Sequence, residues 1–247
     1  MKKTIYLLLF TLGFSIQTNS QNQSLSPQNN PANTHLLKPE TSKMSWFIVR
    51  DSTKIKIGDI YTDVKKNKSR VIITTTVVMK QSPNKWVDST IVNAKNFKPI
   101  YHSSCNQQRD MVLKFDDKIT GYYLDKQTNT KTKILEYTNK PFFDSNFYPQ
   151  LLRFLPLKNG YSKTISIFDY NPKSSVGVIS ATIKSTEKIA IKYNGKLKQV
   201  WKVETTDDIS NNNALMTYYI DILTRKLIKQ ELDLEGRKMI MKLIEEN

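Results

Sequence analysis

Short β-prone runs separated by turn residues recur about every ten to fifteen residues along most of this chain. The clearest is Ser69–Lys80, a β-branched run without Gly or Pro. Lys54 to Ile60 alternates lysine with isoleucine, which is the period of a half-buried strand. Strands at this spacing predict one continuous antiparallel sheet that is strongly curved or partly closed. The fold class is therefore mostly β.

The remaining strands are expected between polar or glycine-containing joints. Asn194-Gly195 is the strongest turn signal, because both residues tolerate the positive φ of a type I′ turn. Asp116-Asp117-Lys118 indicates another tight hairpin. The expected strands are Met44–Asp51, Lys85–Asn93, Phe97–Ser103, Arg109–Phe115, Ile119–Lys126, Lys131–Tyr137, Tyr161–Tyr170, Ala181–Lys192, Leu197–Thr205, Leu215–Asp221, Lys226–Leu234 and Arg237–Ile244.

One apolar segment departs from the strand pattern. Asp144 or Ser145 is a suitable N-cap, Pro149 fits a first helical turn, and Pro156 ends the run. Leu151, Leu152 and Leu155 then share one helical face. We expect one α-helix near residues 145–155 that plugs the open side of the sheet.

The first twenty residues have the pattern of a secretory signal peptide. Lys2 and Lys3 precede an apolar run of about twelve residues, and small polar residues follow. A membrane-spanning helix needs roughly twenty residues, so this run is too short to remain as an anchor. Cys105 is the single cysteine and lies far from the leader, which excludes an internal disulfide and a lipid-modified N-terminus. We expect an exported, soluble, periplasmic protein.

Composition divides the chain into three parts. Residues 1–20 are the signal peptide, residues 21–43 are expected to form a flexible polar linker, and residues 44–247 form a single β-rich half-barrel domain. The linker is dense in Gln, Asn, Ser, Thr and Pro and buries little apolar surface, although Leu36 and Leu37 offer a weak docking point. The domain of roughly 200 residues is long enough for a sizeable core.

The formal net charge of +16 attracts anionic partners. The leader carries two lysines and no acids, so the mature chain keeps about +14 (16 − 2). Export disfavours nucleic acid and leaves peripheral association with an anionic membrane surface. The lysines are scattered and form no block, so the charge equally fits a lysine-rich genome composition.

No residue pattern predicts catalysis, a metal or a cofactor. His102 and Cys105 are close in sequence, but residues three apart on a strand point to opposite faces, so we expect a surface histidine and a buried or half-buried thiol. Asp116-Asp117 and Asp207-Asp208 lie at expected turns, where Asp serves local hydrogen bonding. Glycine-rich phosphate loops are absent from the sequence. Acidic candidates without a spacing signal are Asp63, Asp88, Glu136, Asp144 and Glu204.

Aromatic residues are abundant, and two interpretations stay open. They line an apolar ligand pocket, with the helix face as one wall, or they are the core itself. The candidate ligand-lining residues are Trp86, Phe97, Tyr101, Tyr123, Phe147, Tyr148, Leu151, Leu155 and Trp201.

The step from Phe97-Lys98-Pro99-Ile100-Tyr101 into the Arg109 strand, and the stretch Asp144 to Leu157 followed by Gly160, have a familiar order. From Ser45 to Ile244 the chain resembles a group of exported bacterial proteins of unknown function that are related in shape to the lipoprotein carriers LolA and LolB. The resemblance implies a curved half-barrel with a helix across its mouth and an apolar cavity, which in the carriers holds acyl chains. It assigns no ligand-binding residue here.

Three functions follow as hypotheses. The first is a non-catalytic exported protein that holds a lipid or other amphipathic envelope molecule in an apolar concavity. The second is an envelope scaffold with a filled core that binds another protein through a sheet edge. The third is an enzyme acting on a glycan or lipid.

Overall fold

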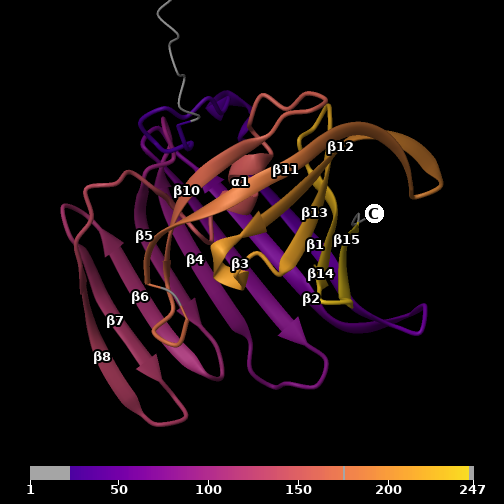
Figure 1. Ribbon diagram of the computed structural model, residues 1–247. Helices are drawn as coiled ribbons and strands as arrows, with labels where there is room; N and C mark the ends of the chain where they lie inside the picture. Colours follow the sequence, from indigo (N-terminus) through magenta and orange to yellow (C-terminus); the bar gives the residue numbers. More distant parts are fainter. Residues whose placement is uncertain (1–22, 175, 245–247) are drawn as a thin grey trace, which may run out of the picture.

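The computed structural model describes residues 23–174 and 176–244, and they form a mostly β molecule (Figure 1). An antiparallel meander makes up its first half. The strands are β1 Glu40–Arg50, β2 Thr53–Lys66, β3 Arg70–Met79, β4 Trp86–Asn93, β5 Pro99–Cys105, β6 Arg109–Phe115, β7 Ile119–Asp125 and β8 Thr130–Glu136. The signal peptide expected at residues 1–20 lies outside the described residues.

The second half begins with a short strand and a short helix and continues as another meander. Its elements are β9 Phe143–Asp144, α1 Tyr148–Leu152, β10 Lys163–Tyr170, β11 Val176–Tyr193, β12 Lys196–Asp207, β13 Ala214–Asp221, β14 Leu227–Leu234 and β15 Arg237–Ile244. Two single-turn 3₁₀ helices, η1 Thr34–Leu36 and η2 Asp208–Ser210, complete the described elements.

All the strands belong to one large sheet. Its order is β8-β7-β6-β5-β4-β3-β2-β1-β15-β14-β13-β12-β11-β10-β9, so β1 and β15 join the two halves. The pairings are antiparallel except between β9 and β10. Because β8 and β9 stand at opposite ends of the order, the described sheet is not closed.

The turn chemistry places the hairpins as the sequence predicts. Asn194 and Gly195 have φ of 47° and 77° between β11 and β12, which fits the type I′ expectation. Glu235 and Gly236 turn the chain between β14 and β15, again with positive φ. The expected strands are confirmed, and the short β9 is the strand that the sequence pattern did not indicate.

Helix α1 is shorter than expected and begins later. Phe147 precedes it without a side-chain cap, and Pro149 lies in its first turn. The expectation that Asp144 or Ser145 caps the helix is wrong, because Asp144 belongs to β9 and its carboxylate accepts a hydrogen bond from Thr90 of β4. After Leu152 the chain continues in turns, with the Phe154 N–H bonded to the Leu151 carbonyl.

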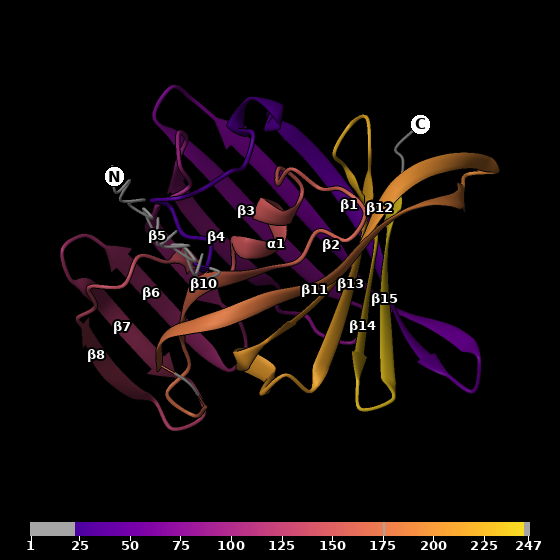
Figure 2. The same cartoon turned by 45° about the horizontal axis from the view of Figure 1, so that its top comes forward.

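The two halves of the sheet share one hydrophobic core around α1. Figure 2 shows α1 between β2–β4 and β10–β11. Phe97, from the loop before β5, stacks against Phe147 at 5.0 Å between ring centroids. The fully buried members from α1 and both halves include Val71, Val92, Leu151, Leu152, Ile165, Ile167, Ala181, Ile183, Val203 and Ile220.

The described segment before β1 packs on this core, so the expectation of a flexible polar linker over residues 21–43 is wrong for residues 23–43. The Leu25 N–H bonds the Thr164 carbonyl at 2.8 Å, and the Ser166 N–H returns a bond to the Leu25 carbonyl at 2.9 Å. The Leu25 and Leu37 side chains are buried, whereas Leu36 is exposed. Two well-spaced leucines and a free strand edge therefore order a stretch whose composition is otherwise polar.

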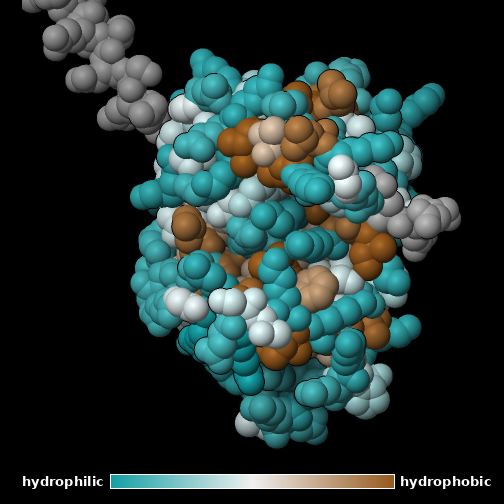
Figure 3. Space-filling view, turned by 90° about the vertical axis from the view of Figure 1, so that its right-hand side faces the viewer, coloured by the Kyte–Doolittle hydropathy of each residue, from teal (hydrophilic) through white to brown (hydrophobic). Residues whose placement is uncertain are grey.

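The outer surface is mixed. On the side that carries the β11–β12 hairpin tip and β15, small apolar patches lie among hydrophilic residues (Figure 3). Leu197 at that tip is 79% exposed. Among the described helices, none has the length and apolar character needed to cross a membrane.

Candidate functional site

Strand register builds two rows of side chains on the inner face, the face of the sheet against which α1 packs. Residues directly opposite each other in a ladder point to the same face. The apolar row crosses five strands and consists of Leu243, Met44, Ile60, Val77 and Trp86. The polar row lies beside it and consists of Ser42, Thr62, Thr75, Asp88 and Ser104.

A cleft of about 280 Å³ lies between these rows and the first turn of α1. We call it the inner cleft. Trp46, Leu227 and Met241 extend its apolar lining, and Pro149 and Gln150 of α1 form the opposite wall. The indole N–H of Trp46 is buried and has no hydrogen-bond partner among the described residues. The inner cleft thus combines apolar walls with an unused donor.

Arg153 closes one side of the inner cleft. It is buried, and its guanidinium pairs with Glu40 of β1 and donates to the Gln150 side chain at 2.7 Å. Its Nε donates to the Arg225 carbonyl at 2.6 Å, in the turn between β13 and β14. One charged side chain therefore fixes the end of α1 to both halves of the sheet.

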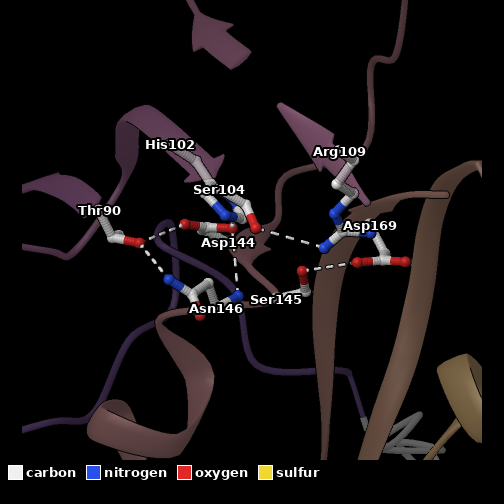
Figure 4. A network of polar contacts seen from close by, with 8 residues as sticks. All are labelled: Thr90, His102, Ser104, Arg109, Asp144, Ser145, Asn146 and Asp169. Carbon is white, nitrogen blue, oxygen red and sulfur yellow. Dashed lines mark hydrogen bonds and ion pairs between the residues drawn. The ribbon is translucent and has the colours of Figure 1, made fainter. Parts of the chain in front are cut away.

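A buried polar cluster lies further along the inner face (Figure 4). His102 of β5 donates from Nδ1 to the Asp144 carboxylate at 3.0 Å. Thr90 donates to the other carboxylate oxygen at 3.1 Å and accepts from the Asn146 amide at 2.9 Å. The Asn146 backbone N–H also donates to Asp144. These bonds connect β4 and β5 of the first half with β9 of the second half.

The charges in this cluster shift the protonation of His102. Burial alone would lower the pKa of His102, but the Asp144 carboxylate beside it, with Asp88 and Asp169 further away, raises that pKa above its usual range. The pairing with Asp144, whose side chain is fully buried, therefore favours the protonated form of His102.

Arg109 and Asp169 extend the cluster toward β6 and β10. Burial raises the pKa of Asp169, Asp144 adds to this rise, and the Ser145 hydroxyl, which donates to Asp169 at 2.8 Å, opposes it. Arg109 reaches Ser104 only weakly, at 3.4 Å, and its Nε is buried without a hydrogen-bond partner among the described residues. The described residues thus leave part of the hydrogen-bonding capacity of this guanidinium unused.

A pocket of about 220 Å³ opens beside these groups, and we call it the polar pocket. His102, Ser104, Arg109 and Asp169 all line it. The polar pocket shares Trp86, Asp88 and Asn146 with the inner cleft, so the two hollows adjoin. The Trp86 indole donates to Asp88 at 2.7 Å and is held at this boundary.

The cluster orients an imidazole but brings no nucleophile into hydrogen-bond contact with it in the described part of the chain. Cys105 lies on the opposite face from His102, and burial together with Asp110 raises the pKa of its thiol, which disfavours the thiolate. Across residues 23–174 and 176–244, no three His, Cys, Asp or Glu side chains gather as a metal would need. The contacts of the cluster are hydrogen bonds and charge pairs.

Residues 41–242 match the sequence profile of a family described as protein of unknown function, DUF3108. The chain belongs to the DUF3108 family. No curated protein matches it significantly. The match spans both halves of the sheet and every residue of the inner cleft except Glu40 and Leu243.

The residues predicted to line a ligand pocket occupy several different environments in this DUF3108 protein. Trp86 borders both hollows on the inner face, and Tyr123 joins a second buried cluster with Phe168 and Tyr170. Trp201 packs against the main core, and Tyr101 lies on the outer face of β5. The remaining five are buried in the packed core: Phe97, Phe147, Tyr148, Leu151 and Leu155.

Sequence reasoning missed most of the polar cluster. His102 is buried, so the expectation of a surface histidine is wrong, because Asp144 supplies the partner that makes its burial tolerable. Asp144 itself was a candidate only because it is acidic. The alternation in residues 101–105 was the available signal, since it places His102 and Ser104 on one face. Nothing local connects that face with Asp144, which is 42 residues away.

Proposed function

We propose that this protein is a non-catalytic, exported binding protein that holds an amphipathic envelope molecule in the inner cleft. The observation that carries the proposal is the inner cleft itself, an apolar-walled hollow of about 280 Å³ that the chain does not fill with its own side chains. Burial of apolar ligand surface there would contribute about 25 cal/mol per Å² before the costs of binding.

Two features support an amphipathic ligand over a purely apolar one. Ser42, Thr62 and Thr75 line the inner cleft beside its apolar residues and offer hydroxyl groups to a ligand that carries polar atoms. The adjoining polar pocket offers Arg109 and Ser104 to a polar end. An amphiphile would place its alkyl chain in the inner cleft and its polar head in the polar pocket.

The proposal includes a half-barrel shape with α1 as its stopper, a soluble periplasmic location and a signal peptide at residues 1–20. The resemblance to lipoprotein carriers supports the half-barrel shape, and the leader pattern supports the signal peptide and the periplasmic location. The net charge of about +14 that remains without the leader (16 − 2) adds attraction to an anionic membrane surface from which such a ligand would be taken.

Binding of a dansyl-labelled fatty acid to the purified protein tests the proposal. Ile60 is half-buried in the apolar row, so Ile60→Trp should fill the inner cleft and weaken binding at least tenfold. Ile72 is half-buried on the outer face of neighbouring β3, so the matched Ile72→Trp should bind like the native protein. Absence of saturable binding to the native protein, or equal loss in both variants, would refute the proposal.

A scaffold function is the second candidate, and the sheet edge favours it. Strand β8 pairs only with β7 among the described residues, and Leu135 and Tyr137 beside its edge are 47% and 63% exposed. An unpaired edge of this kind accepts a strand from another envelope protein. Under this alternative Leu135→Lys abolishes partner capture from an envelope extract, and Ile60→Trp leaves capture unchanged.

A further inference from the structure

A third hollow, of about 580 Å³, opens where the loops at one end of the first meander meet the turn after β10. We call it the amide pocket, because six of its lining residues carry primary amides: Asn84, Asn106, Gln107, Gln108, Gln127 and Asn171. They come from the β3–β4, β5–β6 and β7–β8 loops and from the turn after β10. Four separate chain segments thus present the same functional group to one hollow.

The amide pocket adjoins the site already described. Trp86, Arg109 and Asn171 line both the amide pocket and the polar pocket. Trp86 also lines the inner cleft. The three hollows therefore meet at Trp86: the inner cleft with its apolar walls, the polar pocket, and the amide pocket with its hydrogen-bonding groups.

Some of these side-chain amides form hydrogen bonds within the protein, and others do not. The Asn106 and Asn171 carbonyl oxygens accept backbone N–H bonds within their own turns, and Gln107 donates to Ser82 at 2.7 Å. The side chains of Asn84, Gln108 and Gln127 make no hydrogen bond within residues 23–174 and 176–244. These three are available to a ligand.

The chemistry of the lining fits sugar hydroxyls. A hydroxyl both donates and accepts, and a primary amide offers two donors and an acceptor on one planar group, so each amide can satisfy neighbouring hydroxyls. The Trp86 indole supplies a flat apolar surface on which the C–H face of a sugar ring packs. Lys85, Arg109 and Lys173 also line the amide pocket, but Lys173 is paired with Asp125, and Asp88 and Asp169 line the adjoining polar pocket. The balance of charge therefore does not select a phosphate head.

We propose that the ligand is a glycolipid whose glycan head occupies the amide pocket and polar pocket while its alkyl tail lies in the inner cleft. This inference rests on the proposed function and names its ligand class. Trp86 lies where the tail meets the head, and the side-chain amides of the amide pocket form hydrogen bonds with the glycan hydroxyl groups.

Two amphiphiles with the same tail test the inference: dodecyl maltoside and dodecylphosphocholine, each titrated below its critical micelle concentration and followed by tryptophan fluorescence. The native protein should bind the maltoside at least fivefold more tightly. The double variant Gln108→Ala/Gln127→Ala should lose this preference while its affinity for dodecylphosphocholine stays unchanged. Gln199→Ala, which removes an exposed amide from distant β12, is the matched control and should keep the preference.

The outcomes separate the two proposals. Equal affinity of the native protein for both amphiphiles, or an unchanged preference in the double variant, overturns the glycolipid assignment and leaves the binding function intact. Failure of both amphiphiles to bind overturns the binding function and the glycolipid assignment with it. Loss of both affinities in Ile60→Trp, with the head-group preference present in the native protein, supports both.

Discussion

Removal of the Asp144 carboxylate should be one of the most damaging single changes in this fold. Asp144 accepts hydrogen bonds from His102, Thr90 and the Asn146 backbone, and its side chain is fully buried. The variant Asp144→Ala leaves a buried imidazole whose pKa is then lowered by burial without its main opposing partner. It also leaves two donors without an acceptor.

The expected cost follows from the type of interaction. Removing one member of a buried ion pair typically costs about 3–5 kcal/mol, because the other member stays buried without compensation. In a chain of this size each kcal/mol lowers the melting temperature by roughly 2–4 °C, so the melting temperature of Asp144→Ala should fall by about 6–20 °C. Asp63→Ala removes a partner from an exposed ion pair with Lys65 and should cost less than about 1 kcal/mol.

Urea unfolding followed by tryptophan fluorescence measures both variants on the same scale. The reasoning requires Asp144→Ala to lose several times as much free energy of unfolding as Asp63→Ala. If the two variants lose similar amounts, the polar cluster does not join the two halves of the sheet as described.

Three further predictions concern other parts of the fold. Folding raises the pKa of His102, so the contribution of His102 to the free energy of unfolding is fully present below pH of about 6.5 and is lost as pH rises through the folded pKa. The free energy of unfolding should therefore decline over that pH range. The variant His102→Asn should flatten this decline. If the free energy of unfolding of His102→Asn declines with pH by the same amount, titratable groups other than His102 cause the decline. Gly121→Ala would place a Cβ 1.8 Å from the Val112 carbonyl oxygen, so it should destabilise by more than about 2 kcal/mol in the same assay, whereas Gly195→Ala meets no atom within 4 Å and should cost only about 1–2 kcal/mol from its positive φ; equal costs would contradict the close packing of β6 and β7. Arg153→Met should lower the melting temperature and loosen α1, measured by faster amide exchange at Leu151, and unchanged exchange would show that Arg153 does not fix the helix.

The strands were predictable because their signals are local. Residues 70–79 carry a β-branched run, and Asn194-Gly195 carries the turn chemistry, so each hairpin is encoded by residues that are neighbours in the sequence. Register then places whole rows on one face, as Met44, Ile60 and Val77 show. Much of the inner cleft therefore follows from strand pairing once the meander is known.

The polar cluster and the packed N-terminal segment were not predictable in the same way. His102 and Asp144 meet only because β9 returns beside β10 and faces β5, a contact between distant segments. Leu25 orders its segment by bonding to Thr164 and Ser166 across the chain, which composition does not reveal. Helix α1 begins later than the sequence predicts, because Asp144 accepts hydrogen bonds in the polar cluster and does not cap the helix.

Native mass spectrometry of the protein, purified without detergent from the cells that make it, addresses the occupancy of the inner cleft most directly. The account expects a species whose mass exceeds that of the polypeptide by one amphipathic molecule, and expects Ile60→Trp to lack this species. Bare polypeptide alone from the native protein, or the same added mass in Ile60→Trp, would contradict it.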